Sequence, residues 1–282
     1  MKNHGLKTIF AVAFALVMGV SLTSCFNSES SSERDATVLV KVNQYMGLTY
    51  FETADGMKIY PTQASIASYE VNSGTNLSSL DGKWVYAYYY WDTKILDIPQ
   101  DATEVKDVTL GGINDAVTAP LEIVEAGATP DSVNNTPIIT VSLENSFEPY
   151  MPDDHSLLLP INYFLSTKLH SFTLVYFPDE EQQADELKLY LYHDKEGDEP
   201  NMQTTSLAIL MDAYSNYELA NRCHVFYKTF NLGPAIDHYT NKTGFAKPTK
   251  VVIVTTESQS GLSLEDAVEK EYTVEYKPVG TN

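Results

Sequence analysis

The segment at 83–91, KWVYAYYYW, most constrains the fold, because it carries large side chains on both faces of one extended strand. Side chains alternate along a strand, so one face receives Trp84, Tyr86, Tyr88 and Tyr90. The other face receives Val85, Ala87, Tyr89 and Trp91. A strand with bulk on both sides needs cover on both sides, which predicts a central strand or a strand of a closed barrel.

The sequence around this segment is also typical of β structure. Strands are predicted at 37–42, 45–52, 57–60, 94–98 and 105–109. Asp55-Gly56 and Asp81-Gly82 are strong turn signals, and Pro99 ends the strand predicted before it. We therefore expect a small OB-like β-barrel domain at 36–126.

A turn-rich connector is predicted at 127–137 (GATPDSVNNTP), and strand patterns resume after it. Their spacing predicts a β-sandwich domain at 138–282. The predicted strands are 138–143, 171–177, 187–193, 225–232, 250–256 and 271–276. The apolar run at 207–217 fits either a buried strand or a short helix, because periodicity does not separate the two in short runs. The expected fold class is all-β.

The N-terminus resembles a bacterial lipoprotein signal peptide. Two lysines precede an apolar stretch at 9–20, which is followed by Leu22, Thr23, Ser24 and Cys25. The apolar stretch is shorter than the roughly 20 residues that span a bilayer. The resemblance implies a signal peptide at 1–24, acylation of Cys25 and a flexible, serine-rich and acidic tether at 25–35. The alternative is an ordinary secretory signal with an incidental cysteine.

The chain is acidic, with a formal charge of −20 at pH 7. Such a surface repels polyphosphates and anionic headgroups, which disfavours nucleic acid as a partner and basic-patch docking to membranes. Attachment to the membrane is therefore expected through the lipid on Cys25. The other cysteine, Cys223, then has no partner for a disulfide, and we expect it to be a buried apolar residue rather than a reactive thiol.

The layout as a whole resembles the NigD-like lipoproteins. The local match consists of Tyr50, Phe51, Asp55, Gly56, Ile59, Tyr60 and Pro61, followed by the aromatic strand and Ile95-Leu96. The resemblance implies an OB-like barrel, a β-sandwich and an outer-membrane lipoprotein of Gram-negative bacteria that faces the periplasm or the cell surface. The family name derives from a bacteriocin-associated locus, and the resemblance supplies no catalytic or ligand-binding residues. The stretches at 149–168 and 257–270 depart from the family layout.

Two candidate sites follow from local patterns. Trp84, Tyr86, Tyr88 and Tyr90 can form a stacking platform for a sugar ring, or they can fill the core. Asp131, Ser132 and Val133 match a three-residue O-glycosylation sequon, which makes Ser132 a candidate for modification.

Patterns for catalysis and metal binding are weak. The acidic run at 193–199 (HDKEGDE) has oxygen-rich spacing, but its glycine is misplaced for a calcium loop, which favours a solvated hairpin turn. Asp153, Asp154 and His155 imitate an acid–base set but belong to one loop. Gly111-Gly112 lacks the lysine of a phosphate-binding loop, and the sequence has no nucleophile elbow or zinc signature. We expect no enzyme activity, no metal and no cofactor.

The sequence therefore predicts a non-enzymatic lipoprotein that acts by binding or by protein interaction. A glycan-binding accessory lipoprotein and a bacteriocin-associated immunity or protective factor are the alternatives. An exposed aromatic face would favour a glycan, and a large apolar patch would favour a protein partner.

Overall fold

The computed structural model describes residues 32–99, 101–143, 147–179, 185–212 and 216–276. The chain forms two compact units. The first comprises Met1–Val117 and Asp212–His224, and the second comprises Thr118–Met211 and Val225–Asn282. The predicted connector at 127–137 belongs to the second unit and follows its strand β7 (Leu121–Ile123).

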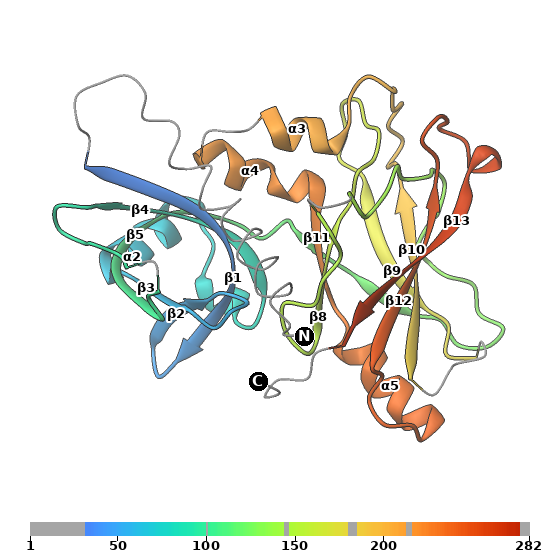
Figure 1. The fold of residues 1–282 in the computed structure, drawn as a ribbon, viewed down its shortest axis with the longest axis horizontal. Coiled ribbons are helices and arrows are strands. Elements are labelled where there is room, and N and C mark those ends of the chain that lie inside the picture. Colours follow the sequence, from blue (N-terminus) through green and yellow to red (C-terminus); the bar gives the residue numbers. More distant parts are fainter. Residues whose placement is uncertain (1–31, 100, 144–146, 180–184, 213–215, 277–282) are drawn as a thin grey trace, which may run out of the picture. The chain divides into compact units, whose positions relative to one another are not determined.

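The first unit contains a closed five-stranded barrel (Figure 1). Its strands are β1 (Glu33–Tyr45), β2 (Leu48–Glu52), β3 (Lys58–Pro61), β4 (Trp84–Asp92) and β5 (Glu104–Asn114). Their order is β1-β2-β3-β5-β4, and β4 pairs with β1 to close the barrel. The β3–β5 pair is parallel and the other pairs are antiparallel. The predicted OB-like barrel is thus confirmed.

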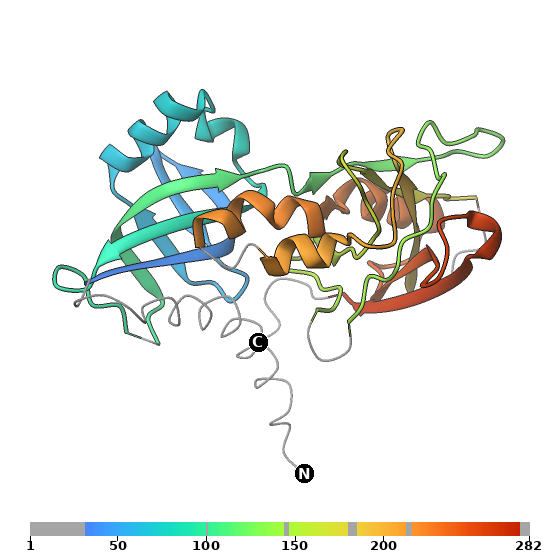
Figure 2. The same ribbon diagram turned by 90° about the horizontal axis from the view of Figure 1, so that it is seen from above.

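The parallel β3–β5 pair requires a crossover, and helix α2 (Gln63–Ser73) and the 3-10 turn η1 (Leu77–Leu80) follow β3. The helix begins where the Thr62 side chain accepts a hydrogen bond from the Ser65 amide. It ends at Gly74, whose φ of 71° suits glycine. Figure 2 shows α2 outside the strands of the barrel. The sequence prediction missed this helix because it buries few side chains.

The barrel interior is filled by the alternate side chains of its strands. The face of β4 that carries Val85, Ala87 and Tyr89 points inward, and the phenol ring of Tyr89 meets Phe51 edge-on at 5.7 Å between centroids. The remaining buried members of this core are Ala36, Val38, Val40, Val42, Ile59, Ile66, Leu77, Leu80, Val105, Val108 and Leu110. The second face of β4 is therefore the outer face of the barrel.

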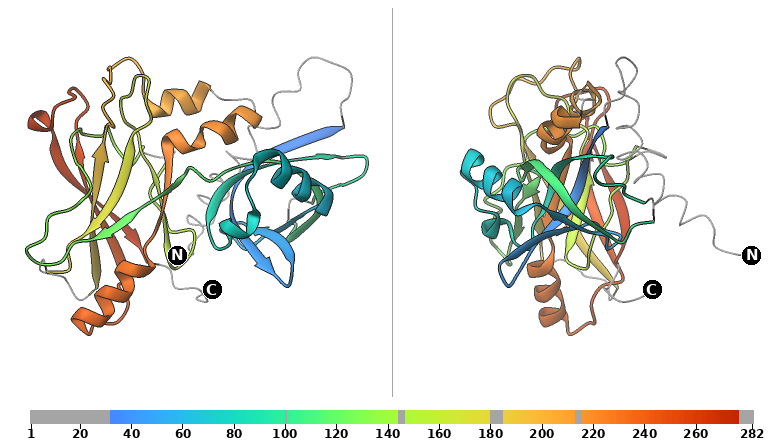
Figure 3. Two further views of the ribbon diagram at one scale, coloured as in Figure 1. Left: turned by 180° about the vertical axis from the view of Figure 1, so that it is seen from behind. Right: turned by 90° about the vertical axis from the view of Figure 1, so that its left-hand side faces the viewer.

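Two sheets form the second unit (Figure 3). The larger has the order β13-β12-β10-β9-β7, with β9 (Ser171–Tyr176), β10 (Glu186–Asp194), β12 (Lys250–Glu257) and β13 (Val268–Glu275). The smaller has the order β6-β11-β8, with β6 (Thr118–Ala119), β8 (Ser156–Pro160) and β11 (Tyr227–Asn231). A short 3-10 turn, η2 (Leu264–Asp266), lies between β12 and β13.

A single apolar cluster draws on both sheets, as a sandwich requires. It includes Leu157 and Leu159 from β8, Leu174 from β9 and Ile253 from β12. Helix α5 (Gly233–Thr243) lies at one end of the sheets (Figure 3) and adds Ala235, Ile236 and Tyr239 to the cluster. The predicted β-sandwich is confirmed. The stretch at 149–168, which departs from the family layout, supplies β8 to this core.

Several predicted elements differ in the structure. The ambiguous run at 207–217 begins as helix α3 (Ser206–Asp212), and helix α4 (Asn216–Phe226) occupies the start of the strand predicted at 225–232. The segment 94–98 forms a turn and coil, and 138–143 makes only isolated bridges. In short apolar runs of this kind, tertiary contacts rather than propensity decide the conformation. Within the described residues, no helix combines the length and apolarity needed to cross a bilayer.

Candidate functional site

The four aromatic residues on the outer face of β4 differ in their access to solvent. Trp84 and Tyr86 are buried, Tyr88 is half-buried, and Tyr90 keeps 41% of its surface exposed. A ligand cannot stack on a buried ring without displacing what covers it. The accessible part of the predicted platform is therefore Tyr88 and Tyr90.

A β-bulge in the neighbouring strand β5 lies beneath these two rings. Tyr88 pairs with Gly112 and Tyr89 pairs with Leu110, so Gly111 is an extra residue in β5. A Cβ atom at position 111 would stand 2.5 Å from Cδ1 of Tyr88 and 3.3 Å from Cδ1 of Tyr90. The two rings thus lie over a position where any larger residue would displace the ring of Tyr88, with 6.2 Å between their centroids.

The hydroxyl of Tyr88 is fixed by a carboxylate. It donates a hydrogen bond to Oδ2 of Asp35 on β1 at 3.2 Å. Burial and the negative charge of Asp35 together raise the pKa of Tyr88 to about 12, so the phenol stays protonated and neutral at pH 7. This end of the barrel presents two phenol rings beside a carboxylate, a combination suited to a neutral, hydroxyl-rich ligand.

The other predicted modification sites are placed as follows. Cys25 lies outside the described residues. Ser132 is half-buried, and its hydroxyl and its backbone amide both donate to Oε2 of Glu122. Oε1 of the same carboxylate accepts a hydrogen bond from the Asp131 amide. Cys223 is 1% exposed and burial raises the pKa of its thiol, as expected for a structural cysteine.

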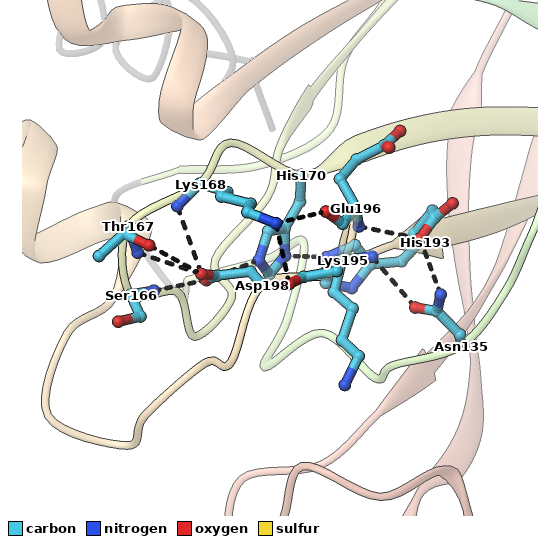
Figure 4. Close-up of polar contacts among 11 residues, drawn as sticks. Asn135, Ser166, Thr167, Lys168, His170, His193, Lys195, Glu196 and Asp198 are labelled. Atoms are coloured by element: carbon cyan, nitrogen blue, oxygen red, sulfur yellow. Dashed lines mark hydrogen bonds and ion pairs between the residues drawn. The ribbon is translucent and has the colours of Figure 1, made fainter.

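The acidic run at 193–199 is only partly the solvated turn that the sequence predicts. His193 and Asp198 are each 2% exposed and point inward, whereas Glu196 is exposed. Figure 4 shows that Asp198 meets His170, which in turn meets His193. Oδ2 of Asp198 is 3.3 Å from Nε2 of His170, and Nδ1 of His170 is 2.7 Å from Nε2 of His193.

Asp198 also ties two loops together. Its carboxylate accepts hydrogen bonds from the backbone amides of Ser166, Thr167 and Lys168 at 2.7 to 3.3 Å (Figure 4). Burial by itself raises the pKa of Asp198, but these amides and His170 outweigh it and hold the pKa well below its ordinary value. Asp198 is therefore a buried anion.

The two histidines are kept in an environment that opposes protonation. Burial lowers the pKa of His193 well below its ordinary value, and His170 lowers it further. Burial also lowers the pKa of His170, although Asp198 opposes part of that shift. The ring of His193 stacks on Phe172 with 4.5 Å between centroids, and its Nδ1 has no hydrogen-bond partner among the described residues.

This cluster has the residue types of a proton relay but lacks access for a substrate. His170, His193 and Asp198 are each at most 4% exposed. Within the described residues, no group of three or more histidine, cysteine, aspartate or glutamate side chains is arranged to hold a metal ion. The arrangement joins the turn after β10 to the segment before β9. Sequence analysis missed it because His170 is distant from 193–199 along the chain.

The loop at 153–155 makes side-chain hydrogen bonds between neighbours, and the carbonyl of His155 accepts a hydrogen bond from the Leu232 amide at 2.6 Å. The amide of His155 donates to Oδ1 of Asp153 at 3.0 Å, and Nδ1 of His155 is 2.6 Å from Oδ1 of Asp154. These are contacts between near neighbours on one exposed loop. They build a turn and do not converge on a common reaction centre.

Comparison with solved structures gives several matches. A predicted lipoprotein from Bacteroides fragilis is 24% identical, with a TM-score of 0.63 over 87% of this chain and all of that one. A NigD-like immunity protein from Bacteroides caccae is 14% identical, with a TM-score of 0.46 over 88% of this chain and 99% of that one. No protein-family model and no curated protein matches the sequence. Solved structures similar to this chain thus include a protein described as NigD-like, and the first match supports the fold alone.

Proposed function

We propose that the protein is a non-enzymatic lipoprotein of the outer membrane, anchored through Cys25, that binds a neutral glycan on the outer face of its barrel. The observation that carries the proposal is the pair of phenol rings, Tyr88 and Tyr90, which cover Gly111 beside Asp35. Tyr90 keeps 41% of its surface exposed at this site, and aromatic faces attract the C–H surface of sugar rings.

The electrostatics of the site favour a sugar over a charged ligand. Asp35 supplies a carboxylate that can accept hydrogen bonds from sugar hydroxyls, and Glu33 adds negative charge close to Tyr88. Nucleic acid and anionic glycans would meet both carboxylates and a chain with a formal charge of −20. A non-enzymatic role is supported by the burial of the His170–His193–Asp198 cluster, which withholds its titratable groups from any substrate.

The test is glycan-array binding by the purified protein together with three variants. Tyr88→Ala and Tyr90→Ala should each remove binding with little change in melting temperature. Gly111→Ala should weaken binding because its Cβ atom displaces the ring of Tyr88. Val71→Ala is the matched control, since Val71 is 81% exposed and lies on α2.

Unchanged glycan binding by Tyr88→Ala and Tyr90→Ala would contradict the proposed site. Absence of binding to any glycan by the wild-type protein would contradict the ligand class. A large fall in melting temperature for Tyr90→Ala would assign that residue to the core instead.

A further inference from the structure

The hairpin between β1 and β2 carries exposed apolar side chains at its tip. Tyr45, Met46 and Leu48 are 64%, 88% and 43% exposed. The two turn residues, Met46 and Gly47, have φ angles of 51° and 79°, both in the left-handed region. Turns of this kind favour asparagine or glycine at the first position, so a methionine there is unfavourable for the turn itself. The tip therefore displays a large apolar side chain against local preference.

The sheet surface behind the tip continues this apolar character. Tyr45 pairs with Leu48 at the end of the hairpin, and the next outward-facing residue of β2, Tyr50, stacks on Tyr60 of β3 with 5.5 Å between centroids. The ammonium of Lys58 is 5.5 Å from the centroid of Tyr50. Stacking and lysine contact already occupy these ring faces, so the surface is less suited to a sugar than the Tyr88–Tyr90 site.

The charge near the tip differs from that of the chain as a whole. Residues 33–117 contain six lysines and arginines and twelve aspartates and glutamates. Two of the six cations lie toward this end of the barrel, Lys83 beside Val42 and Lys106 opposite Tyr60. Asp81, which accepts a hydrogen bond from the Gln44 amide, and Asp107, which follows Lys106, lie toward the same end. The tip is therefore flanked by charges of both signs, which zwitterionic headgroups do not repel.

We propose that Tyr45, Met46 and Leu48 insert into the interface of the bilayer that holds the lipid on Cys25, as a second membrane contact. The inference rests on the proposed anchor. Seven residues, 26–32, separate the cysteine from β1, so Cys25 lies at most about 29 Å from Glu33. β1 is about 40 Å long, so the tip meets the bilayer when β1 slopes toward the surface and its Glu33 end, with the adjoining Tyr88–Tyr90 site, is held clear of the lipid.

The anchor explains why so small an apolar surface suffices. A stable protein interface buries about 800 Å² on each partner, which three side chains do not supply. A bilayer held near the tip by the anchor is present at high effective concentration, so a weak contact becomes populated. Tyrosine, methionine and leucine suit the boundary between headgroups and acyl chains.

The test uses the full lipidated protein in phosphatidylcholine vesicles that contain brominated lipid, which quenches nearby tryptophan. On binding vesicles, Met46→Trp should show a blue shift of its tryptophan emission. Brominated lipid should quench a larger fraction of its emission than of the wild-type emission, because Trp84 is buried and Trp91 is half-buried in the wild-type protein. Val71→Trp, at an exposed position on α2, should show neither change.

Flotation of the vesicles separates the two proposals. Protein that floats with the vesicles while Met46→Trp remains unquenched would overturn the second contact and leave the anchor intact. Protein that floats no better than Cys25→Ala would overturn the anchor, and the second contact with it. A photo-crosslinker at position 46 that captures a protein in place of lipid would also overturn the bilayer as the occupant of this surface.

Discussion

Strands β4 and β10 are both paired on two sides, but they bury different chemistry. The side chains of Val85, Ala87 and Tyr89 on β4 point into the apolar interior of the barrel, and Tyr90 is exposed on the outer face. β10 alternates just as regularly, yet its inward face carries leucines followed by His193. Buried apolar side chains need only to fill the available volume, whereas buried polar groups also need hydrogen-bond partners at the right positions. Among the described residues, the first unit buries no histidine or carboxylate side chain, whereas the second buries His170, His193, Asp198 and Glu257.

The sharpest test of this contrast uses neighbouring tyrosines on β4. Tyr89→Ala should lower the free energy of unfolding by about 3–5 kcal/mol, because it opens a cavity next to Phe51. Tyr90→Ala should change it by less than about 0.5 kcal/mol, because the ring is on the surface. Urea titration of both variants measures the difference.

Tyr89→Phe is the control for cavity formation. No described residue partners the buried hydroxyl of Tyr89, so its removal should leave stability unchanged or slightly raised. Equal losses for Tyr89→Ala and Tyr90→Ala would contradict the assignment of the inner and outer faces of β4.

The second test removes the buried anion of the second unit. Asp198→Ala should lower the free energy of unfolding by about 2–3 kcal/mol, because it leaves backbone amides and His170 without their acceptor. Glu199→Ala, at the exposed neighbouring position, should have little effect. Thermal unfolding of the two variants measures the difference. Similar melting temperatures would show that the Asp198 carboxylate is not needed for stability.

The third effect, the smallest for each histidine and pH unit, is a pH dependence of stability. The folded state lowers the pKa of His170 and His193, so below a pH of about 6.5 the unfolded chain binds more protons and stability falls as pH falls. Each histidine contributes a slope of at most about 1.4 kcal/mol per pH unit. The lowered pKa of Asp198 acts in the same direction below a pH of about 4.

Unfolding measured between pH 7.5 and 5 checks this expectation. His193→Phe should flatten the slope, since phenylalanine binds no proton in the unfolded chain and still places a ring against Phe172. A wild-type protein with constant stability across this range would contradict the burial of neutral histidines.

The outer face of β4 shows what the alternation of residues can predict and what it cannot. Alternation correctly separates Trp84, Tyr86, Tyr88 and Tyr90 from the inward face, and it does so without any knowledge of the fold. It does not reveal that the first two are buried and the last is exposed, because exposure depends on what packs over each end of a strand. The bulge at Gly111 likewise depends on register between strands.

The helices show a second limit. α2 carries local signals, a threonine cap and a terminal glycine, but its few buried side chains give no clear periodicity. α4 and β11 divide a run that local propensity assigns wholly to a strand. Local signals were present in the first case and overridden by tertiary context in the second.

The net charge of the whole chain does not describe the charge of each part of its surface. The formal charge of −20 argues against membrane docking by the surface as a whole. Folding nevertheless brings Lys83 and Lys106 toward the end of the barrel that carries the exposed hairpin tip. Segments far apart along the chain become one surface, which composition does not describe.

By itself, the sequence determined the β-rich fold class, the barrel with its following sandwich, the two faces of β4 and the motif at Cys25, because these depend on alternation, turn residues and local spacing. The tertiary structure alone decided which aromatic rings reach solvent, how Asp198 meets His170 and His193, and where Met46 is displayed. Those features depend on contacts between residues far apart along the chain, and such contacts are set by register and packing.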